Sequence, residues 1–243
     1  MEIDLPSPLI AKLEWRHDIP VSMREDLFSL LKRERLLDAG SDFKQASWCG
    51  TACSLLVEGV AARYKLMSNG RRQITALHVP GDFVDLASQF VRSRDYEVVA
   101  LSPCRFALAD RDRLQELTEH SAGVTRLLWM DSLIDAAIQQ EWLVSMGRRS
   151  ALEHLAHLVC ELFLRLKVVG RTDGFSFRLP LTQADVADVL GLSMVHVNRM
   201  LKALRGDEVM TWTNQNVTIV NWGRLREIAE FDPDYLAFRR EVA

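Results

Sequence analysis

The sequence predicts an α+β protein with three consecutive parts: an antiparallel β-roll in residues 1–120, a long helix in 121–146 and a winged helix-turn-helix in 147–243. Three observations support this division. Short apolar runs separated by turn residues fill the first part, as expected for the strands of a roll. A continuous helical pattern follows. Near the C-terminus, two capped helices joined by a glycine turn have the helix-turn-helix signature.

The composition is that of an ordinary globular protein. The 243 residues are 48% hydrophobic and 26% charged, and the net charge is -3. Because the whole chain has no basic excess, DNA binding would have to come from the local placement of charge. The chain opens with no signal peptide, and no apolar run reaches the ~18 residues of a membrane span. We therefore expect a cytoplasmic protein with no membrane partner.

The first 120 residues alternate between apolar runs and turns. Three prolines predict an irregular start over residues 1–20, and leucine spacing predicts a helix over 22–38. The Asn69-Gly70 pair predicts a hairpin turn, because both residues tolerate positive φ. Strands are expected around that turn and beyond it, at 55–57, 60–66, 74–79, 97–101 and 105–109.

The long helix at 121–146 follows helical structure at 111–119 and carries two apolar stripes, so it must be covered twice. We expect the stripe Trp129, Leu133, Ala136 and Leu143 to pack on the roll. The second stripe is expected to pack on the same helix of another copy, giving a homodimer; it comprises Leu127, Met130, Ile134, Ala137 and Val144. Burial of both stripes inside a monomer is the alternative. Residues 147–150 then predict a hinge, with Ser150 capping a helix at 151–167.

The helix-turn-helix is predicted from its caps. Thr182 and Asp185 form a capping-box-like start for the first helix, and Gly191 ends it. Ser193 caps the second helix, whose apolar face is Val197, Met200, Leu201 and Leu204. Strands at 209–212 and 217–220 then flank a turn at 213–216, which predicts a wing, and a last helix is expected over 222–230.

The other face of the second helix is the candidate DNA-reading surface. An arginine can bind both acceptors of a guanine edge, whereas asparagine and histidine can bind bases or phosphates. Two alternatives remain at this point: an ordinary helical hairpin, or a helix-turn-helix that contacts another protein. The face carries Met194, Val195, His196, Asn198, Arg199 and Lys202.

The chain as a whole resembles the cyclic-AMP receptor protein/FNR family of transcription regulators. The resemblance covers most of residues 20–230 and is carried by Gly59 with the segment 62–65, the turn 69–74, the segment 80–83, and the helix-turn-helix from Leu181 to Arg199. It implies a cyclic-nucleotide-binding-like roll and a homodimer on near-palindromic double-stranded DNA. RNA polymerase would be a further partner if the protein is an activator.

The resemblance also implies roles for individual residues. Arg199 matches the family's guanine-reading arginine, Thr182 and Gln183 match phosphate contacts, and Ser193 caps the recognition helix. Val195 stands where the family often has a cytosine-binding glutamate, and Met194 also departs from the pattern. A valine can meet a thymine methyl but cannot accept a hydrogen bond, so we expect an unusual half-site.

The sequence defines the effector less clearly than the DNA-binding part. The segment after Asp82 lacks the glutamate of the family's nucleotide pocket, and Arg92-Ser93 and Arg94 come too early to match its Arg-Ser pair. We therefore expect no dependence on cyclic AMP. An iron–sulfur cluster is not expected either, because no cysteine precedes Cys49. Haem bound by His17 or His78 and a ligand-free regulator both remain open.

The four cysteines do not have zinc-site spacing. We expect buried structural thiols, while redox sensing by Cys49, Cys53 or Cys104 remains open. No catalytic triad, phosphate loop or metalloprotease motif is present. We therefore assign no catalytic residue and no metal site, and we do not expect an enzyme.

Overall fold

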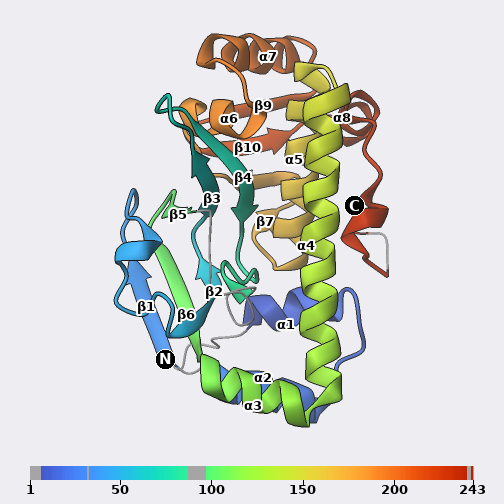
Figure 1. Cartoon of the computed structure of the whole chain (residues 1–243). Helices are drawn as coiled ribbons and strands as arrows, with labels where there is room; N and C mark the ends of the chain where they lie inside the picture. Colours follow the sequence, from blue (N-terminus) through green and yellow to red (C-terminus); the bar gives the residue numbers. More distant parts are fainter. Residues whose placement is uncertain (1–6, 32, 87–96, 240–241, 243) are drawn as a thin grey trace.

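The computed structural model describes residues 7–31, 33–86, 97–239 and 242, and its architecture is α+β, as predicted (Figure 1). An N-terminal β-roll lies beside a long helix, and a small helical domain with a wing follows at the far end of that helix. Within the described residues, no helix has both the length and the apolar character needed to cross a membrane.

The roll consists of two three-stranded sheets in which all strand pairs are antiparallel. The predicted strands are confirmed, as is the hairpin at Asn69-Gly70, where only Gly70 has a positive φ. The sheets have the orders β1–β6–β2 and β4–β3–β5, formed by β1 (Arg33–Leu37), β6 (Cys104–Asp110), β2 (Ala52–Glu58), β4 (Arg72–His78), β3 (Ala61–Leu66) and β5 (Glu97–Ala100).

Gly59 makes the passage from one sheet to the other. Its φ is +94°, and a Cβ atom there would lie 2.4 Å from the carbonyl oxygen of Pro103. Both the backbone conformation and the close approach require glycine. The short turn therefore sends β2 and β3 into different sheets although they are adjacent in sequence.

Two predictions for the N-terminus are wrong. Residues 1–20 are not irregular throughout, because α1 (Ser7–Glu14) is a helix with Leu9 and Leu13 fully buried. Pro8 is tolerated in its first turn, where backbone N–H groups have no helical acceptor. The helix expected over 22–38 is also shorter: α2 (Val21–Leu30) ends early, and β1 pairs with β6. Strand pairing overrides the helical pattern there.

The helices that follow the roll in the sequence are α3 (Arg111–His120), α4 (Ala122–Arg148) and α5 (Ala151–Val168). Ser150 begins α5 with a full capping box, as predicted for a cap. The break between α4 and α5 falls within the predicted residues 147–150. Gly147 is still inside α4, and the chain leaves helical geometry at Arg149.

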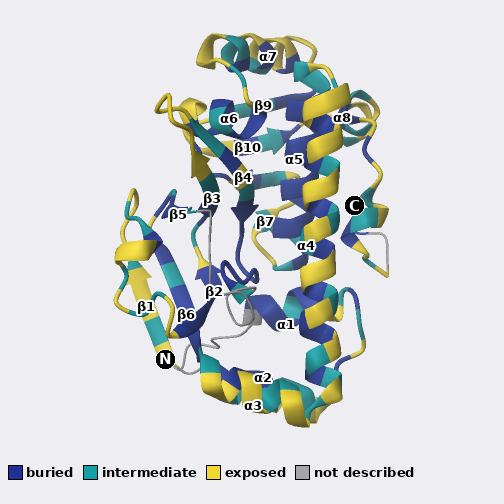
Figure 2. Ribbon diagram, viewed as in Figure 1, coloured by how far each residue is buried: buried dark blue, intermediate teal, exposed yellow. Residues whose placement is uncertain are grey.

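The prediction that the stripe from Leu127 to Val144 faces a partner is wrong for Leu127 and Ile134. Leu127 and Ile134 are buried in the protomer's own core, with exposed fractions of 7% and 6%. Met130 and Ala137 are half-buried, and Val144 is exposed. The roll and α5 cover this face instead, because they lie on the same side of α4 (Figure 2). The stripe expected against the roll is the exposed one: Trp129 (68%), Leu133 (55%) and Leu143 (72%).

The C-terminal part is a winged helix-turn-helix followed by a short tail. Its four-stranded antiparallel sheet has the order β7–β8–β10–β9. The helices pack on this sheet and on α5, sharing one apolar cluster with residues of the second roll sheet. The elements are β7 (Thr172–Asp173), β8 (Ser176–Arg178), α6 (Gln183–Leu190), α7 (Met194–Gly206), β9 (Met210–Thr213), β10 (Asn216–Ile219), α8 (Trp222–Ala229) and η3 (Pro233–Leu236).

A buried network of charged side chains joins the N-terminal helix, the roll and the helices α4 and α5. Lys12 Nζ lies 3.2 Å from Asp82 Oδ1 and 2.9 Å from Asp131 Oδ2. Arg16 binds Asp131 at 2.9 Å, and Arg165 binds Asp82 at 2.7 Å. Attraction to the two cations lowers the pKa of Asp82 although burial acts to raise it.

The network continues from Arg165 toward the C-terminal tail. Arg165 Nη1 donates to Glu161 Oε1 at 2.7 Å, and Trp142 Nε1 and Tyr235 Oη donate to the other carboxylate oxygen at 2.9 and 3.2 Å. Arg16 Nε also donates to the carbonyl of Leu236. Segments near both ends of the chain therefore bind the same group of buried charges.

Replacing Asp131 by Asn should destabilise the protein strongly. The change leaves the buried cations Lys12 and Arg16 short of their shared anion, and breaking a buried pair in this way costs about 3–5 kcal/mol. Urea unfolding would measure the loss. The control is Glu227→Gln at the exposed Arg224–Glu227 pair, where the expected loss is below about 1 kcal/mol. Equal losses in the two variants would contradict a structural role for the network.

His157 should make stability depend on pH. Its ring stacks on Tyr235 and meets Phe231 edge-on, and burial lowers its pKa to about 3. Below the ordinary value of 6.5, the unfolded chain takes up a proton that the folded chain refuses, so stability falls as pH falls from 6.5 toward 3.

His157→Phe should keep the ring packing and remove this contribution. Between pH 6.5 and 4.5, the wild type should lose about 2–3 kcal/mol more than the variant. Urea unfolding at several pH values would measure the difference. The exposed His120→Phe variant should retain the wild-type profile, and a wild-type profile for His157→Phe would contradict the assignment.

Candidate nucleic-acid interface

The first helix of the interface, α6, begins and ends at the predicted residues. The Thr182 hydroxyl accepts from the backbone N–H of Asp185, and Asp185 accepts from the backbone N–H of Thr182, completing a capping box. Gly191 ends the helix in the left-handed conformation with a φ of 67°. Val186, Val189 and Leu190 are buried on its inner face, as predicted.

The second helix, α7, is capped by Ser193, whose hydroxyl accepts from the backbone N–H of His196. Val197, Met200 and Leu204 are buried, and Leu201 is half-buried. This packing turns the opposite face of α7 outward. The helix α7 lies at the outer end of the molecule, away from the roll (Figure 1).

The outer face of α7 brings together the residues predicted to read DNA. Met194 and Val195 are unusually open for apolar residues, with exposed fractions of 54% and 80%. Arg199 and Lys202 are exposed, while His196 and Asn198 are half-buried. Thr182 and Gln183 are exposed at the adjoining start of α6. One surface therefore holds all nine predicted DNA-binding residues, with Ser193 at its edge.

Two side-chain contacts order this surface. Asn198 Nδ2 donates to Gln183 Oε1 at 2.6 Å, linking the two helices, and Arg199 contacts the ring of His196. Sequence reasoning missed both contacts. The first depends on how α6 and α7 cross, which residue spacing along either helix does not give.

The charge of the surface suits a polyanion. α7 contains His196, Arg199, Lys202 and Arg205 and no acidic residue. The acidic residues of the adjoining helix, Asp185 and Asp188, are both paired with an arginine from the roll, Arg72. The net charge of the whole chain hides this local arrangement.

The wing flanks the helices. β9 and β10 pair over four residues, and Asn214 and Gln215 form the turn with φ values of 50° and 66°. Arg178 on β8 donates to the Gln215 side chain at 3.3 Å, which supports the turn from the neighbouring strand. The predicted hairpin at 213–216 is therefore confirmed.

In the roll, the aspartates near the family's nucleotide-binding segment point into the protein. Asp82 belongs to the buried charge network, and Asp85 is 1% exposed and accepts from the backbone N–H of Ser54 at 2.6 Å. The anion-binding candidates Arg92, Ser93 and Arg94 lie outside the described residues.

The thiols and histidines considered as sensors are mostly enclosed. Cys53, Cys104 and Cys160 are buried, and Cys49 is half-buried. Burial raises the pKa of the Cys104 thiol to about 11, which lowers its reactivity. His78 is 5% exposed in β4, and burial lowers its pKa to about 3. In the described part of the chain, no three His, Cys, Asp or Glu side chains gather as metal ligands.

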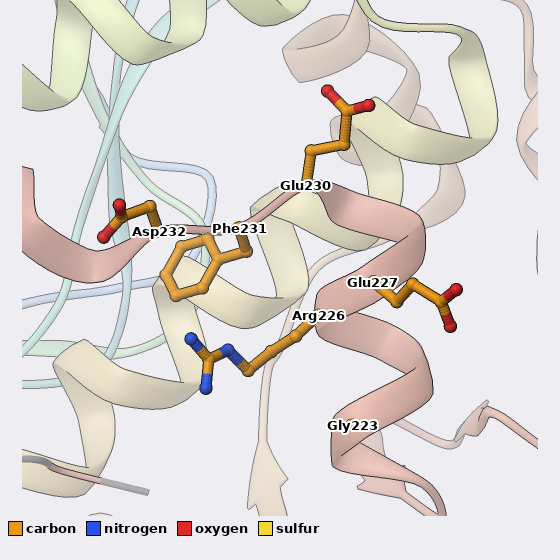
Figure 3. Close-up of a pocket in the computed structure, with 6 residues that line it drawn as sticks. All are labelled: Gly223, Arg226, Glu227, Glu230, Phe231 and Asp232. Carbon is orange, nitrogen blue, oxygen red and sulfur yellow. The ribbon is translucent and has the colours of Figure 1, made fainter.

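A depression beside α8 suits an anion less well than the outer face of α7 does. It is lined by Arg226 and Phe231, by three carboxylates at Glu227, Glu230 and Asp232, and by Gly223 (Figure 3). Figure 3 shows the side chains of Glu227 and Glu230 pointing away from the Phe231 ring. Three negative charges at one opening would repel phosphate, so α6 and α7, not this depression, form the candidate nucleic-acid interface.

Comparison with known proteins supports this assignment. The cyclic nucleotide-binding domain family matches residues 43–121, and the Crp-like helix-turn-helix domain family matches residues 153–228. A roll of the first kind joined to a helix-turn-helix of the second defines a class of DNA-binding transcription regulators.

Relatives that match over almost three quarters of their length show the family. The chain is 30% identical over 183 residues to the transcriptional activator protein FnrL of Cereibacter sphaeroides, covering 74% of this chain and 73% of FnrL. It is 30% identical over 179 residues to the nitrogen fixation regulation protein FixK of Bradyrhizobium diazoefficiens, covering 72% of each. The structure of FixK2 from Bradyrhizobium japonicum superposes with a TM-score of 0.72 at 25% identity, covering 81% of this chain and 96% of FixK2. The chain belongs to the Crp/Fnr family of transcription regulators.

Proposed function

We propose that the protein binds near-palindromic DNA as a homodimer and places one α7 helix in each of two successive major grooves. The observation that carries this proposal is the outward face of α7, which presents basic and apolar side chains and no carboxylate. A dimer of this kind reads two half-sites about one helical turn apart. It would act in the cytoplasm, and RNA polymerase would be its partner if it activates transcription.

The dimer contact is supported by an exposed heptad stripe on α4. Eight consecutive positions at alternating spacings of four and three are all exposed, which is the pattern of a coiled-coil seam. Arg126 and Gln140 are the polar positions within it, and polar residues in a seam help to fix the register of the two helices. The stripe comprises Ala122, Arg126, Trp129, Leu133, Ala136, Gln140, Leu143 and Gly147.

The proposed reading of DNA divides the surface into two kinds of contact. Arg199 would bind the guanine edge, and Met194 and Val195 would meet apolar groups such as the thymine methyl. Thr182, Gln183 and the N-terminus of α7 capped by Ser193 would contact phosphates. His196, Asn198 and Lys202 complete the surface as base or phosphate contacts.

Regulation without cyclic AMP and without an iron–sulfur cluster is part of the proposal. The first point is supported by the missing glutamate after Asp82. The second is supported by the absence of any cysteine before Cys49 in the sequence. Control by abundance or by another ligand would fit the same chain.

Arg199→Ala should weaken binding to the preferred site by about 1–3 kcal/mol and relax selectivity at one base pair of each half-site. The preferred site would first be selected from random duplex DNA by the wild-type protein, and affinities would follow from fluorescence anisotropy. Arg205→Ala is the matched control. Arg205 is an exposed arginine in the last turn of the same helix, so the change removes the same charge and should leave base selectivity unaltered. Equal base selectivity in wild type and Arg199→Ala would contradict the assignment.

Leu133→Asp should convert the dimer into a monomer, because it places a carboxylate in the middle of the proposed seam. Analytical ultracentrifugation would measure the mass. Leu36→Asp is the control, since Leu36 is 74% exposed on β1 of the roll. A dimeric Leu133→Asp variant, or a wild type that is monomeric at every concentration and on DNA, would refute the α4 interface.

A further inference from the structure

The β3–β4 hairpin of the roll reaches across to α6, the first helix of the helix-turn-helix (Figure 1). Two neighbouring residues just after its turn make the polar contacts. Arg72 binds side chains of α6, and Gln73 binds its backbone. The roll therefore contacts the DNA-facing unit directly, in addition to the covalent path through α4 and α5.

Arg72 uses two separate nitrogens. Its Nε donates to Asp188 Oδ2 at 2.8 Å and its Nη2 to Asp185 Oδ1 at 2.7 Å. The rigid fork of a guanidinium suits this two-point contact, which a lysine cannot reproduce. The arginine thereby spans one turn of α6.

The carboxylate of Asp185 joins this contact to the start of the DNA-facing surface. While one oxygen binds Arg72, the other accepts from the backbone N–H of Thr182 at 2.9 Å and from the Thr182 hydroxyl at 2.6 Å. A single side chain therefore connects the hairpin of the roll to a residue at the proposed phosphate contact.

Gln73 holds the opposite end of the same helix. Its Nε2 donates to the carbonyl oxygens of Asp188 at 2.8 Å and Val189 at 3.2 Å. These carbonyls belong to the last turn of α6, where helix geometry provides no partner. Ile74 and Leu77 of the same strand belong to the apolar cluster that also contains Val186 and Val189, so apolar packing accompanies the polar contacts between β4 and α6.

The roll is also the part of the protomer on which the first half of α4 packs. Val124, Leu127 and Leu128 of α4 lie in one buried cluster with Leu55 and Val57 of β2. If α4 forms the dimer seam, the roll and α4 together make the frame of the dimer. The hairpin then fixes α6, and with it α7, relative to that frame.

We propose that Arg72 and Gln73 are positioning residues that set the distance between the two recognition helices and hence the half-site spacing that the dimer accepts. This inference rests on the proposed dimeric DNA binding. Without the hairpin contact, α6 would be held to the frame only indirectly, through α5, which is anchored by the α4–α5 joint at Arg149 and Ser150 and by the Arg165–Asp82 pair. The dimer would then tolerate half-sites at several spacings.

The test measures the affinity of the full-length protein for fluorescein-labelled duplexes carrying the selected site. The central spacer is shortened by one base pair, kept, or lengthened by one or two, and a single half-site duplex serves as reference. Arg72→Ala should reduce the preference for the native spacer by about threefold to tenfold. Its affinity for the single half-site should stay at the wild-type value.

Three further variants sharpen the test. Arg71→Ala removes the same charge from the neighbouring exposed position and should leave the spacer preference unchanged. Asp188→Ala removes one of the two partners of Arg72 and should act in the same direction but more weakly. The double variant should be no worse than Arg72→Ala alone, because Arg72→Ala already breaks that contact. Arg72→Lys should restore only part of the preference.

The inference is overturned if Arg72→Ala retains the wild-type spacer preference, or if Arg71→Ala loses it equally. A uniform change in affinity at all spacers and at the single half-site would also overturn it, because that pattern indicates a general effect on stability or charge. Failure of the proposed function is distinguishable, since the wild-type protein itself would then select no two-fold site.

Discussion

The arrangement of the protomer depends on a cluster of buried charges centred on Asp82. This aspartate, at the turn after β4, binds Lys12 of α1 and Arg165 of α5. Each ion loses its hydration on burial, and only close pairing with opposite charge compensates for that loss. The roll, the N-terminal helix and the first helix of the DNA-binding domain can therefore satisfy these groups only in one mutual orientation. The apolar cluster shared by β4, α5 and α6 has the same effect.

This constraint relates the fold to its proposed task. A dimer that reads two half-sites must hold two recognition helices at a fixed separation, and each helix is short and lies at the end of the molecule. Buried ion pairs fix α5, while the hairpin contacts of Arg72 and Gln73 fix α6. A signal that altered the roll would act on both connections, since Asp82 and Arg72 stand at opposite ends of β4 and its turn.

The DNA-facing surface and the effector region differ in how far local sequence defines them. The caps at Thr182 and Ser193 and the glycine at Gly191 define α6 and α7 without help from distant residues. The roll depends on long-range pairing, such as that of β1 with β6. Because local pattern does not reveal this pairing, it wrongly predicted a helix over the residues of β1. The role of Asp82 in the roll is also not evident from the sequence. Its burial and its pairing with Lys12 and Arg165 give it a structural role that residue spacing does not reveal.

The sequence by itself determined the α+β class, the order of the three parts, the positions of most strands and the residues on the outer face of α7, because caps, turns and periodicity are local properties. Tertiary structure alone decided which apolar stripe of α4 is free. Both stripes have helical spacing, and only the packing of the roll and α5 buries Leu127 and Ile134 while leaving Trp129, Leu133 and Leu143 exposed. It also decided the partners of Lys12, Arg72 and Gln73, because these contacts join residues about 70 to 120 positions apart, beyond the reach of any local pattern.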